Sequence, residues 1–202
     1  MLWRQFLAGK FKKGRRIFFV AGERPADVIE QPNYHFAEFG ESDFKQSSLV
    51  QTRDRPKVFS IRLSWGHRCY GWRHHDGQIA SYLWFSDSNA LNTPWMFDVN
   101  LMMHPGCAYI WDCRTAPEHA SRGLYTAGLA RLQRLAAKQG ATSALIDCAP
   151  DNAPSIRAIE KAGFRRVSDV ELRQIGPLHL LRINSKKWRT VSECLDPHWL
   201  ES

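Results

Sequence analysis

A strand–helix–strand succession over residues 107–149 is the feature that most constrains how this sequence can fold. The run Cys107–Thr115 (CAYIWDCRT) has the composition of a strand, and Arg122–Gln139 carries apolar residues at helical spacing before Gly140. The apolar run Ser143–Ala149 (SALIDCA) is too short for a helix and is followed by Pro150. Two strands joined by one helix run parallel, with a right-handed crossover. The sequence therefore predicts a parallel strand pair.

The flanking residues favour further strands and a second helix. The predicted strands are a run from Lys57 through Val58, Ile61 and Leu63; a hairpin of His67–Arg73 and Ile79–Ser86 around His75-Asp76-Gly77; Met96–Met103; and a closing pair, Arg165–Arg173 with Leu178–Asn184. Asn152 or Ser155 is expected to cap a helix that ends near Ala162. The predicted fold class is α+β, a mixed α/β arrangement of strands and helices.

The chain of 202 residues is long enough for one domain of ordinary size. Residues 22–56 are polar and rich in proline, so we expect a loop with at most one short helix and a boundary near Arg55. We predict a basic N-terminal extension over residues 1–55 that packs on the core, a main domain over residues 56–185 and a C-terminal tail over residues 186–202.

The first 20 residues alternate basic with large apolar side chains and contain no acid. Such a stretch can pack as a terminal strand or helix on the domain, or it can lie on a membrane surface or on nucleic acid. The net charge of +8 favours anionic partners without choosing among nucleic acid, a phosphate-bearing cofactor and a negatively charged membrane. We expect nucleic acid to be an unlikely partner, because no recognition motif for it is present.

Five cysteines, an odd number with no CxxC pair, indicate reduced thiols and a cytoplasmic location. No apolar run approaches the roughly 20 residues that span a bilayer, and none matches a signal-peptide core. A metal site is not expected, because the cluster of His67, Cys69, His74 and His75 lacks ligand spacing. A serine hydrolase is not expected either, because G-x-S-x-G is absent.

The loop Thr115–Gly128 (TAPEHASRGLYTAG) joins the first parallel strand to the long helix. A helix N-terminus presents free N–H groups with partial positive charge, which suits a phosphate. Gly123 would let an anion approach the backbone, and Arg122 adds a charged donor. A glycine at such a position can equally serve only to make the turn.

Read together with Asp151–Val167 (DNAPSIRAIEKAGFRRV), this loop resembles the two signature segments of the GNAT acetyltransferase superfamily. Thr115-Ala116-Pro117 stands for the family's V-x-P step, and Gly123 lies at the expected offset from it. The later pattern N-x-x-(A/S)-x-x-x-Y-x-K-x-G-F is matched in register by Asn152, Ser155, Lys161, Gly163 and Phe164. The resemblance covers about residues 57–184.

The resemblance implies a mostly antiparallel twisted sheet with one splayed parallel pair, flanked by helices. It also implies that acetyl-CoA is the co-substrate and that an amine attacks the thioester directly. The cofactor-binding residues it implies are Cys113, Thr115, Ser121, Arg122, Gly123, Leu124, Tyr125, Asn152 and Ser155. As a hypothesis of our own, we expect the acceptor to be a small-molecule primary amine such as an amino sugar or amino acid, and a homodimer is an open alternative to a monomer.

The candidate catalytic residues are Asp112, an acid in an apolar strand, Glu118 and His119 in the loop, and Ser155 as a donor to the thiolate. Each also has a structural interpretation, as a hydrogen-bond partner, a solvent-facing loop residue or a helix cap. Ile159 stands where many family members carry a tyrosine that protonates the leaving thiolate, and Ala120 and Tyr125 also depart from the pattern. A degenerate acyl-CoA-binding module and a membrane- or nucleic-acid-associated adaptor are therefore the alternatives.

Overall fold

The computed structural model of the protein describes residues 11–21, 27, 30–45, 47, 49, 55–97, 99–191 and 194–195. Predictions made for residues 1–10 and for the end of the chain from 196 onward lie outside these described residues. Among the described helices, none combines the length and the apolar composition that a membrane span requires.

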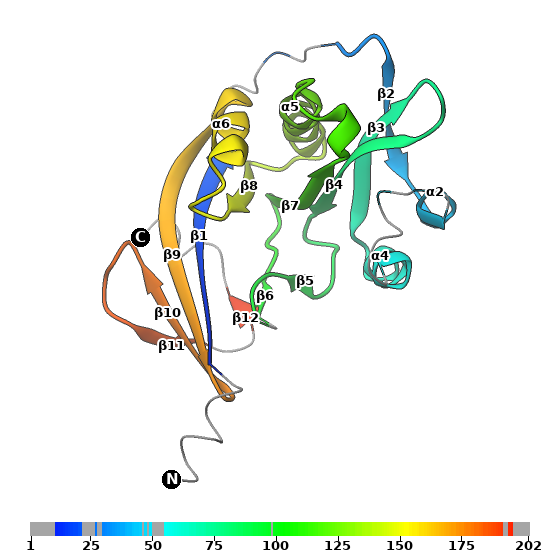
Figure 1. The fold of residues 1–202 in the computed structure, drawn as a ribbon. Helices are drawn as coiled ribbons and strands as arrows, with labels where there is room; N and C mark the ends of the chain where they lie inside the picture. Colours follow the sequence, from blue (N-terminus) through cyan, green and yellow to red (C-terminus); the bar gives the residue numbers. More distant parts are fainter. Residues whose placement is uncertain are drawn as a thin grey trace.

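One large twisted sheet organises the described chain (Figure 1). Its strands, in spatial order, are β11 (Arg189–Val191), β10 (Leu178–Ile183), β9 (Phe164–Ile175), β1 (Phe11–Ala21), β8 (Ser143–Cys148), β7 (Cys107–Thr115), β4 (Ile79–Ser86), β3 (Arg68–His74) and β2 (Tyr34–Phe39). Neighbouring strands in this sheet pair antiparallel except for β7 and β8, which are parallel. The structure confirms the predicted fold class, a mostly antiparallel sheet with one parallel pair.

Helices cover the two faces of the sheet. On one face α5 (Leu124–Lys138) and α6 (Ala153–Lys161) bury Leu129, Leu132 and Ile159 against β-strand side chains such as Phe19 and Ile146. The other face packs Phe44 of α2 (Glu41–Lys45) and Phe59 of α4 (Arg55–Ser64) against Trp84 of β4. A small second sheet is formed by β5 (Thr93–Pro94), β6 (Asn100–Leu101) and β12 (Cys194–Leu195). The first two strands lie in the segment that connects β4 to β7, and β12 lies near the end of the chain.

Most predicted elements are confirmed. The β3–β4 hairpin, the β7–α5–β8 unit, α6 and the β9–β10 pair lie where the sequence indicates. Asn152 is the N-cap of α6, and its Oδ1 accepts a hydrogen bond from the Ser155 backbone N–H. These segments carry strong local signals, because apolar periodicity and turn or cap residues agree along each of them.

Three predictions for the regions between these elements are wrong. The run from Lys57 forms helix α4, because its apolar residues also satisfy a helical spacing and Phe59 is buried at 1% exposure. Residues 34–39, expected in a loop, form the edge strand β2, whose Phe36 packs edge-to-face on Trp72 of β3. Met96–Met103 contains only the two-residue strand β6 among its described residues.

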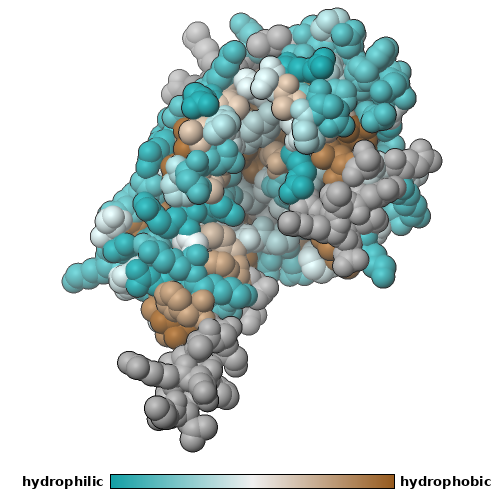
Figure 2. Space-filling model, viewed as in Figure 1, coloured by the Kyte–Doolittle hydropathy of each residue, from teal (hydrophilic) through white to brown (hydrophobic). Residues whose placement is uncertain are grey.

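The basic N-terminal segment enters the sheet as β1. It pairs antiparallel with β9 along its whole length and with β8 from Ile17 to Val20. Its apolar end, Ile17–Val20, is buried, whereas Phe11 at its start is 56% exposed. On the face seen in Figure 2 the surface is mostly hydrophilic, and one of its hydrophobic patches lies at the lower end of β1, β9 and β10, where Phe11 and Leu178 are exposed beside Ile175.

Candidate active site

The parallel strands β7 and β8 separate part-way along their length. Their pairing runs from Cys107–Ser143 to Ile110–Ile146 and, within these fully described strands, goes no further. Two features account for the separation. β7 bulges beyond Ile110, and β8 ends at Cys148 shortly before Pro150, which has no N–H to offer a ladder.

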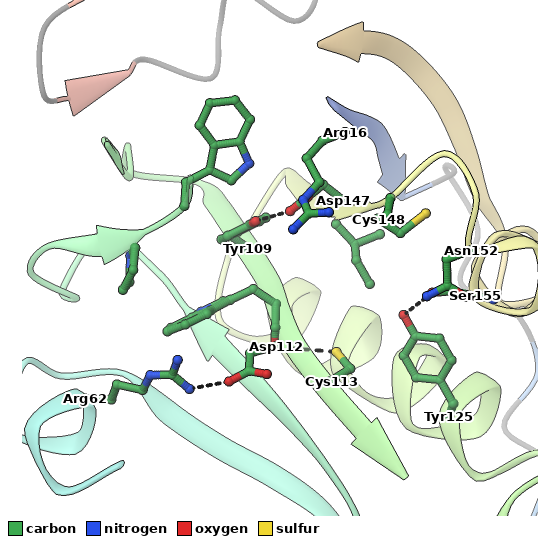
Figure 3. Close-up of a pocket in the computed structure, with 15 residues that line it drawn as sticks. Arg16, Arg62, Tyr109, Asp112, Cys113, Tyr125, Asp147, Cys148, Asn152 and Ser155 are labelled. Atoms are coloured by element: carbon green, nitrogen blue, oxygen red, sulfur yellow. Dashed lines mark hydrogen bonds and ion pairs between the residues drawn. The ribbon is translucent and has the colours of Figure 1, made fainter. Parts of the chain in front are cut away.

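The bulge in β7 is centred on Asp112. Tyr82 and Trp84 of β4, two residues apart, pair with Arg114 and Trp111, three residues apart, so β7 holds one extra residue there. Asp112 takes a left-handed backbone conformation with φ of 38°. A bulge bends its strand and turns a side chain in a new direction, and here the Asp112 carboxylate points toward Arg62 of α4 (Figure 3).

The space between the diverging strands is a cavity of about 370 Å³, which we call the splay cavity. Residues from four strands, three helices and the segment between β4 and β7 line it. They include Arg16 on β1, Arg62 on α4, Trp95 just after β5, and Asp147 on β8. Tyr109 and Asp112 come from β7. The cavity thus combines two carboxylates, two guanidinium groups and aromatic rings.

Beyond η1 (Pro117–His119), the loop turns into α5 through Ser121 and Gly123, which have φ values of 59° and 78°. Gly123 is the N-cap of α5, and a Cβ added there would meet only Gln31 Nε2, at 3.7 Å. In the described part of the chain, no hydrogen bond occupies the backbone N–H groups from Ser121 to Tyr125. These amides therefore remain open to an anion at the front of α5.

A second cavity of about 570 Å³, the loop cavity, lies in front of these amides. Residues Ser121–Thr126 line it together with Thr115, His119 and the start of α6. Four residues line both this cavity and the splay cavity: Cys113, Tyr125, Asn152 and Ser155. The two cavities are therefore adjacent, and an elongated molecule with an anionic end can extend from one into the other.

Residues 34–164 match the Acetyltransferase (GNAT) family. The chain belongs to the GNAT acetyltransferase family. The matched region contains the first signature segment, the second as far as Phe164, and the two splayed strands, whereas β1, β9 beyond its first residue, and β10 lie outside it.

Solved GNAT structures share this fold. A GNAT-family structure from Novosphingobium aromaticivorans is 19% identical with a TM-score of 0.58, covering 82% of this chain and 65% of that one. A GNAT acetyltransferase from Colwellia psychrerythraea is 13% identical with a TM-score of 0.60, covering 87% and 62%. A GCN5-related N-acetyltransferase from Sphaerobacter thermophilus is 11% identical with a TM-score of 0.55, covering 96% and 57%. This GNAT chain therefore spans less than two thirds of the length of these structures, and no curated protein matches it.

All nine predicted cofactor-binding residues of this GNAT protein line one or both cavities. Thr115 donates a hydrogen bond from Oγ1 to Ser81 Oγ at 3.2 Å, which fixes it at the end of β7. Arg122 is exposed, and its guanidinium contacts the Glu118 carbonyl at 3.3 Å. Burial raises the pKa of the Cys113 thiol well above its usual value, so this thiol is neutral at the junction of the cavities.

The predicted catalytic residues are not all brought together. Asp112 lies in the splay cavity, where its Oδ2 is 2.6 Å from Arg62 Nη1, and Ser155 lies at the junction. Glu118 is exposed on η1 and lines neither cavity. His119 is buried beside the loop cavity, with Nδ1 3.0 Å from the Tyr34 hydroxyl.

Four site residues escaped the sequence analysis: Arg16, Arg62, Tyr109 and Asp147. Asp147 carries the same signal as Asp112, an acid in an otherwise apolar strand (SALIDCA), and that signal could have found it. Arg16 and Arg62 come from segments assigned to an extension and to a strand, so no local pattern directed them to the site.

Arg62 is held by aromatic rings as well as by Asp112. Its guanidinium carbon lies 4.4 Å from the Trp111 ring centroid, 5.1 Å from that of Trp84 and 5.3 Å from that of Phe59. Cation–π contacts and a charge-assisted hydrogen bond together fix this side chain, which is 15% exposed. The Arg62–Asp112 pair therefore forms a rigid wall of the splay cavity.

Proposed function

We propose that this GNAT protein transfers an acetyl group from acetyl-CoA to the primary amine of a small molecule, by direct attack of the amine on the thioester. The observation that carries the proposal is the junction of the two cavities. One presents open amides at the N-terminus of α5, and the other opens between strands whose pairing ends at Ile110 and Ile146.

The diphosphate of CoA would bind the N–H groups from Ser121 to Tyr125, where the dipole of α5 favours negative charge. Arg122 would add a charged contact from the exposed side of the loop. The pantetheine arm would then pass Cys113 and Asn152 and pair with the unpaired backbone of β7 and β8 as an added strand does. In this arrangement the thioester reaches the splay cavity, and a backbone N–H at the bulge can polarise its carbonyl.

The leaving thiolate needs a proton donor. Ile159, at the usual position of the family's tyrosine, is fully buried in the core between α6 and the sheet. The hydroxyls of Tyr125 and Ser155 line the junction instead, and they would donate to the sulfur as the C–S bond breaks.

A catalytically degenerate acyl-CoA-binding module is the second candidate, and the burial of Ile159 in place of an accessible phenol favours it. A thiol-release assay with acetyl-CoA and a panel of primary amines, run beside calorimetric titration with CoA, tests both. Binding with amine-dependent thiol release supports the transferase. Binding without release across the panel supports the module, and absence of CoA binding by the folded chain overturns both proposals.

A further inference from the structure

The splay cavity holds two carboxylates, one on each side of the strand opening, and their surroundings differ. Asp112 is bound at 2.6 Å by Arg62, which aromatic rings cage. Asp147 on β8 directly follows Ile146, the last residue paired with β7, and its side chain is 8% exposed. Asp147 accepts a hydrogen bond from the Tyr109 hydroxyl and forms an ion pair with Arg16, whose Nε is 3.0 Å from Oδ2 (Figure 3).

We propose that Asp147 accepts the proton that the acceptor's ammonium group must lose before attack, and that Arg16 and Tyr109 are its positioning residues. This inference rests on the proposed function. In the step, one N–H bond of the ammonium breaks and its proton joins a carboxylate oxygen of Asp147. The free amine then forms the C–N bond, the C–S bond breaks, and the second amine proton is released as the thiolate is protonated.

The chemistry of the cavity fits a cationic amine. Carboxylates attract an ammonium group, and Trp95 and Tyr109 add aromatic rings to the lining, whereas the Trp111 ring already contacts Arg62. Arg16 and Arg62 offset the two carboxylates, so the cavity has no net charge from these four groups until the ammonium gives its proton to Asp147. The acceptor class expected is therefore a primary amine that is protonated at neutral pH.

Burial opposes ionisation of Asp147 and raises its pKa above the ordinary value, although the Tyr109 hydrogen bond and Arg16 act in the opposite direction. A carboxylate with a raised pKa is a better proton acceptor than an ordinary aspartate. The raised pKa therefore agrees with the proton-accepting role that we propose for Asp147 from its position and contacts.

The groups that can influence Asp147 come from every element around the cavity. They are Arg16 on β1, Tyr109, Asp112 and Cys113 on β7, Cys148 beside it on β8, Arg62 on α4, Tyr125 on α5 and Ser155 on α6. Burial raises the pKa of Cys148 to about 11 and those of Tyr109, Cys113 and Tyr125 well above their usual values. These four groups therefore stay neutral through the acid range in which Asp147 titrates.

A direct test is to follow the aspartate carboxyl carbons of the full chain by ¹³C NMR across pH 3–8, using Asp147→Asn to assign the resonance. We expect a pKa above the ordinary aspartate value in the wild type. Arg16→Gln removes a stabilising cation and should raise it further, whereas Arg16→Lys should restore it. An ordinary or lowered pKa for Asp147 in the wild type would overturn the inference without needing any acceptor.

A kinetic test uses saturating acetyl-CoA with the fastest of ethanolamine, glycine and D-glucosamine. Asp147→Asn should lower kcat by about 100-fold and abolish the acidic limb of its pH profile, whereas the matched Asp112→Asn should retain that limb. Arg16→Gln should move the limb to higher pH. Thermal unfolding and CoA affinity check that each variant is folded.

The outcomes separate the inference from the proposed function. If the wild type turns over and folded Asp147→Asn has the same rate and the same pH profile, the inference is refuted and the proposed function stands. Wild-type CoA binding with no thiol release for any of the amines counts against the transferase and against the inference together.

Discussion

The hydroxyl of Tyr125 on α5 lies 3.3 Å from the hydroxyl of Ser155 on α6, at the place where the loop cavity meets the splay cavity. The two residues are 30 positions apart in sequence, and the β7–α5–β8–α6 topology brings them together. Burial raises the pKa of Tyr125 well above its usual value, so its phenol keeps its proton at neutral pH. A protonated phenol at this junction is suited to donate to a developing thiolate.

Tyr125→Phe should therefore lower kcat for acetyl transfer by about 100-fold while changing the affinity for CoA by less than about threefold. The reason is that the phenol would act on the leaving group and not on the bound cofactor. Ser155→Ala, the matched variant across the hydrogen bond, should have a smaller effect. Steady-state kinetics with calorimetric CoA affinities check this, and an unchanged kcat in folded Tyr125→Phe would leave the phenol a packing role only.

A substitution of Gly123 tests whether the loop before α5 binds the anionic part of CoA. Its φ of 78° belongs to the left-handed region, where a side chain costs about 1–2 kcal/mol. Gly123→Val should weaken CoA binding by at least about tenfold, because a side chain and a shifted loop would obstruct the amides from Ser121 to Tyr125.

Gly140 supplies the matched control for Gly123. It lies just beyond the other end of α5 with φ of 83°, and a Cβ there would meet nothing within 4 Å. Gly140→Val should thus carry a similar backbone penalty and leave CoA affinity unchanged. Equal affinities of the two folded variants for CoA, measured by calorimetry, would show that the loop before α5 does not hold the cofactor.

Asn152 combines a structural and a binding role that two substitutions can separate. Its Oδ1 accepts from the Ser155 N–H at 3.2 Å, so Asn152→Ala should cost about 1 kcal/mol of stability through the lost cap. Asn152→Asp keeps an acceptor for this cap but loses the side-chain N–H donor, which we expect to hydrogen-bond the pantetheine arm as it passes Asn152. We expect it to retain stability in urea unfolding and to bind CoA several-fold more weakly, and full CoA affinity in this variant would remove Asn152 from the cofactor site.

The sequence predicts the helix ends and the parallel strand pair correctly, because the local signals in these segments agree. Gly123, Gly140 and the Asn152 cap mark the ends of α5 and α6, and their positions predict the parallel pair and the loop before α5. These features depend on backbone rules that act within a few residues, so no distant partner is needed to infer them. The same holds for Asp112, which interrupts an apolar strand.

The features that the sequence did not predict depend on contacts between residues far apart in the chain. The segment containing Arg16 was interpreted as an extension, because nothing in its basic and apolar residues shows that β8 and β9 leave a place for it between them. The segment containing Arg62 has apolar residues that fit a strand or a helix, and Phe59 packing against Trp84 selects the helix. Tertiary contacts thus supplied the two arginines of the splay cavity.

The buried imidazole of His67 should make the free energy of unfolding depend on pH. The side chain is 1% exposed, its Nδ1 is 2.8 Å from Ser86 Oγ, and that oxygen also accepts a hydrogen bond from Trp111 Nε1. Burial, with the nearby Arg62 charge, lowers the pKa of His67 from 6.5 to about 4. The unfolded chain therefore binds a proton more readily than the folded chain between these values, and stability falls as the pH drops through this window.

The loss expected from His67 is up to about 3 kcal/mol between pH 7 and pH 4. His67→Gln keeps a hydrogen-bonding group toward Ser86 and does not titrate, so its free energy of unfolding should be lower than that of the wild type at pH 7 and depend less on pH. Urea unfolding of both proteins at pH 7 and pH 4.5 measures the difference. If the two proteins lose the same stability over this interval, His67 is not the group that couples protonation to unfolding, and the acid sensitivity belongs to carboxylates elsewhere.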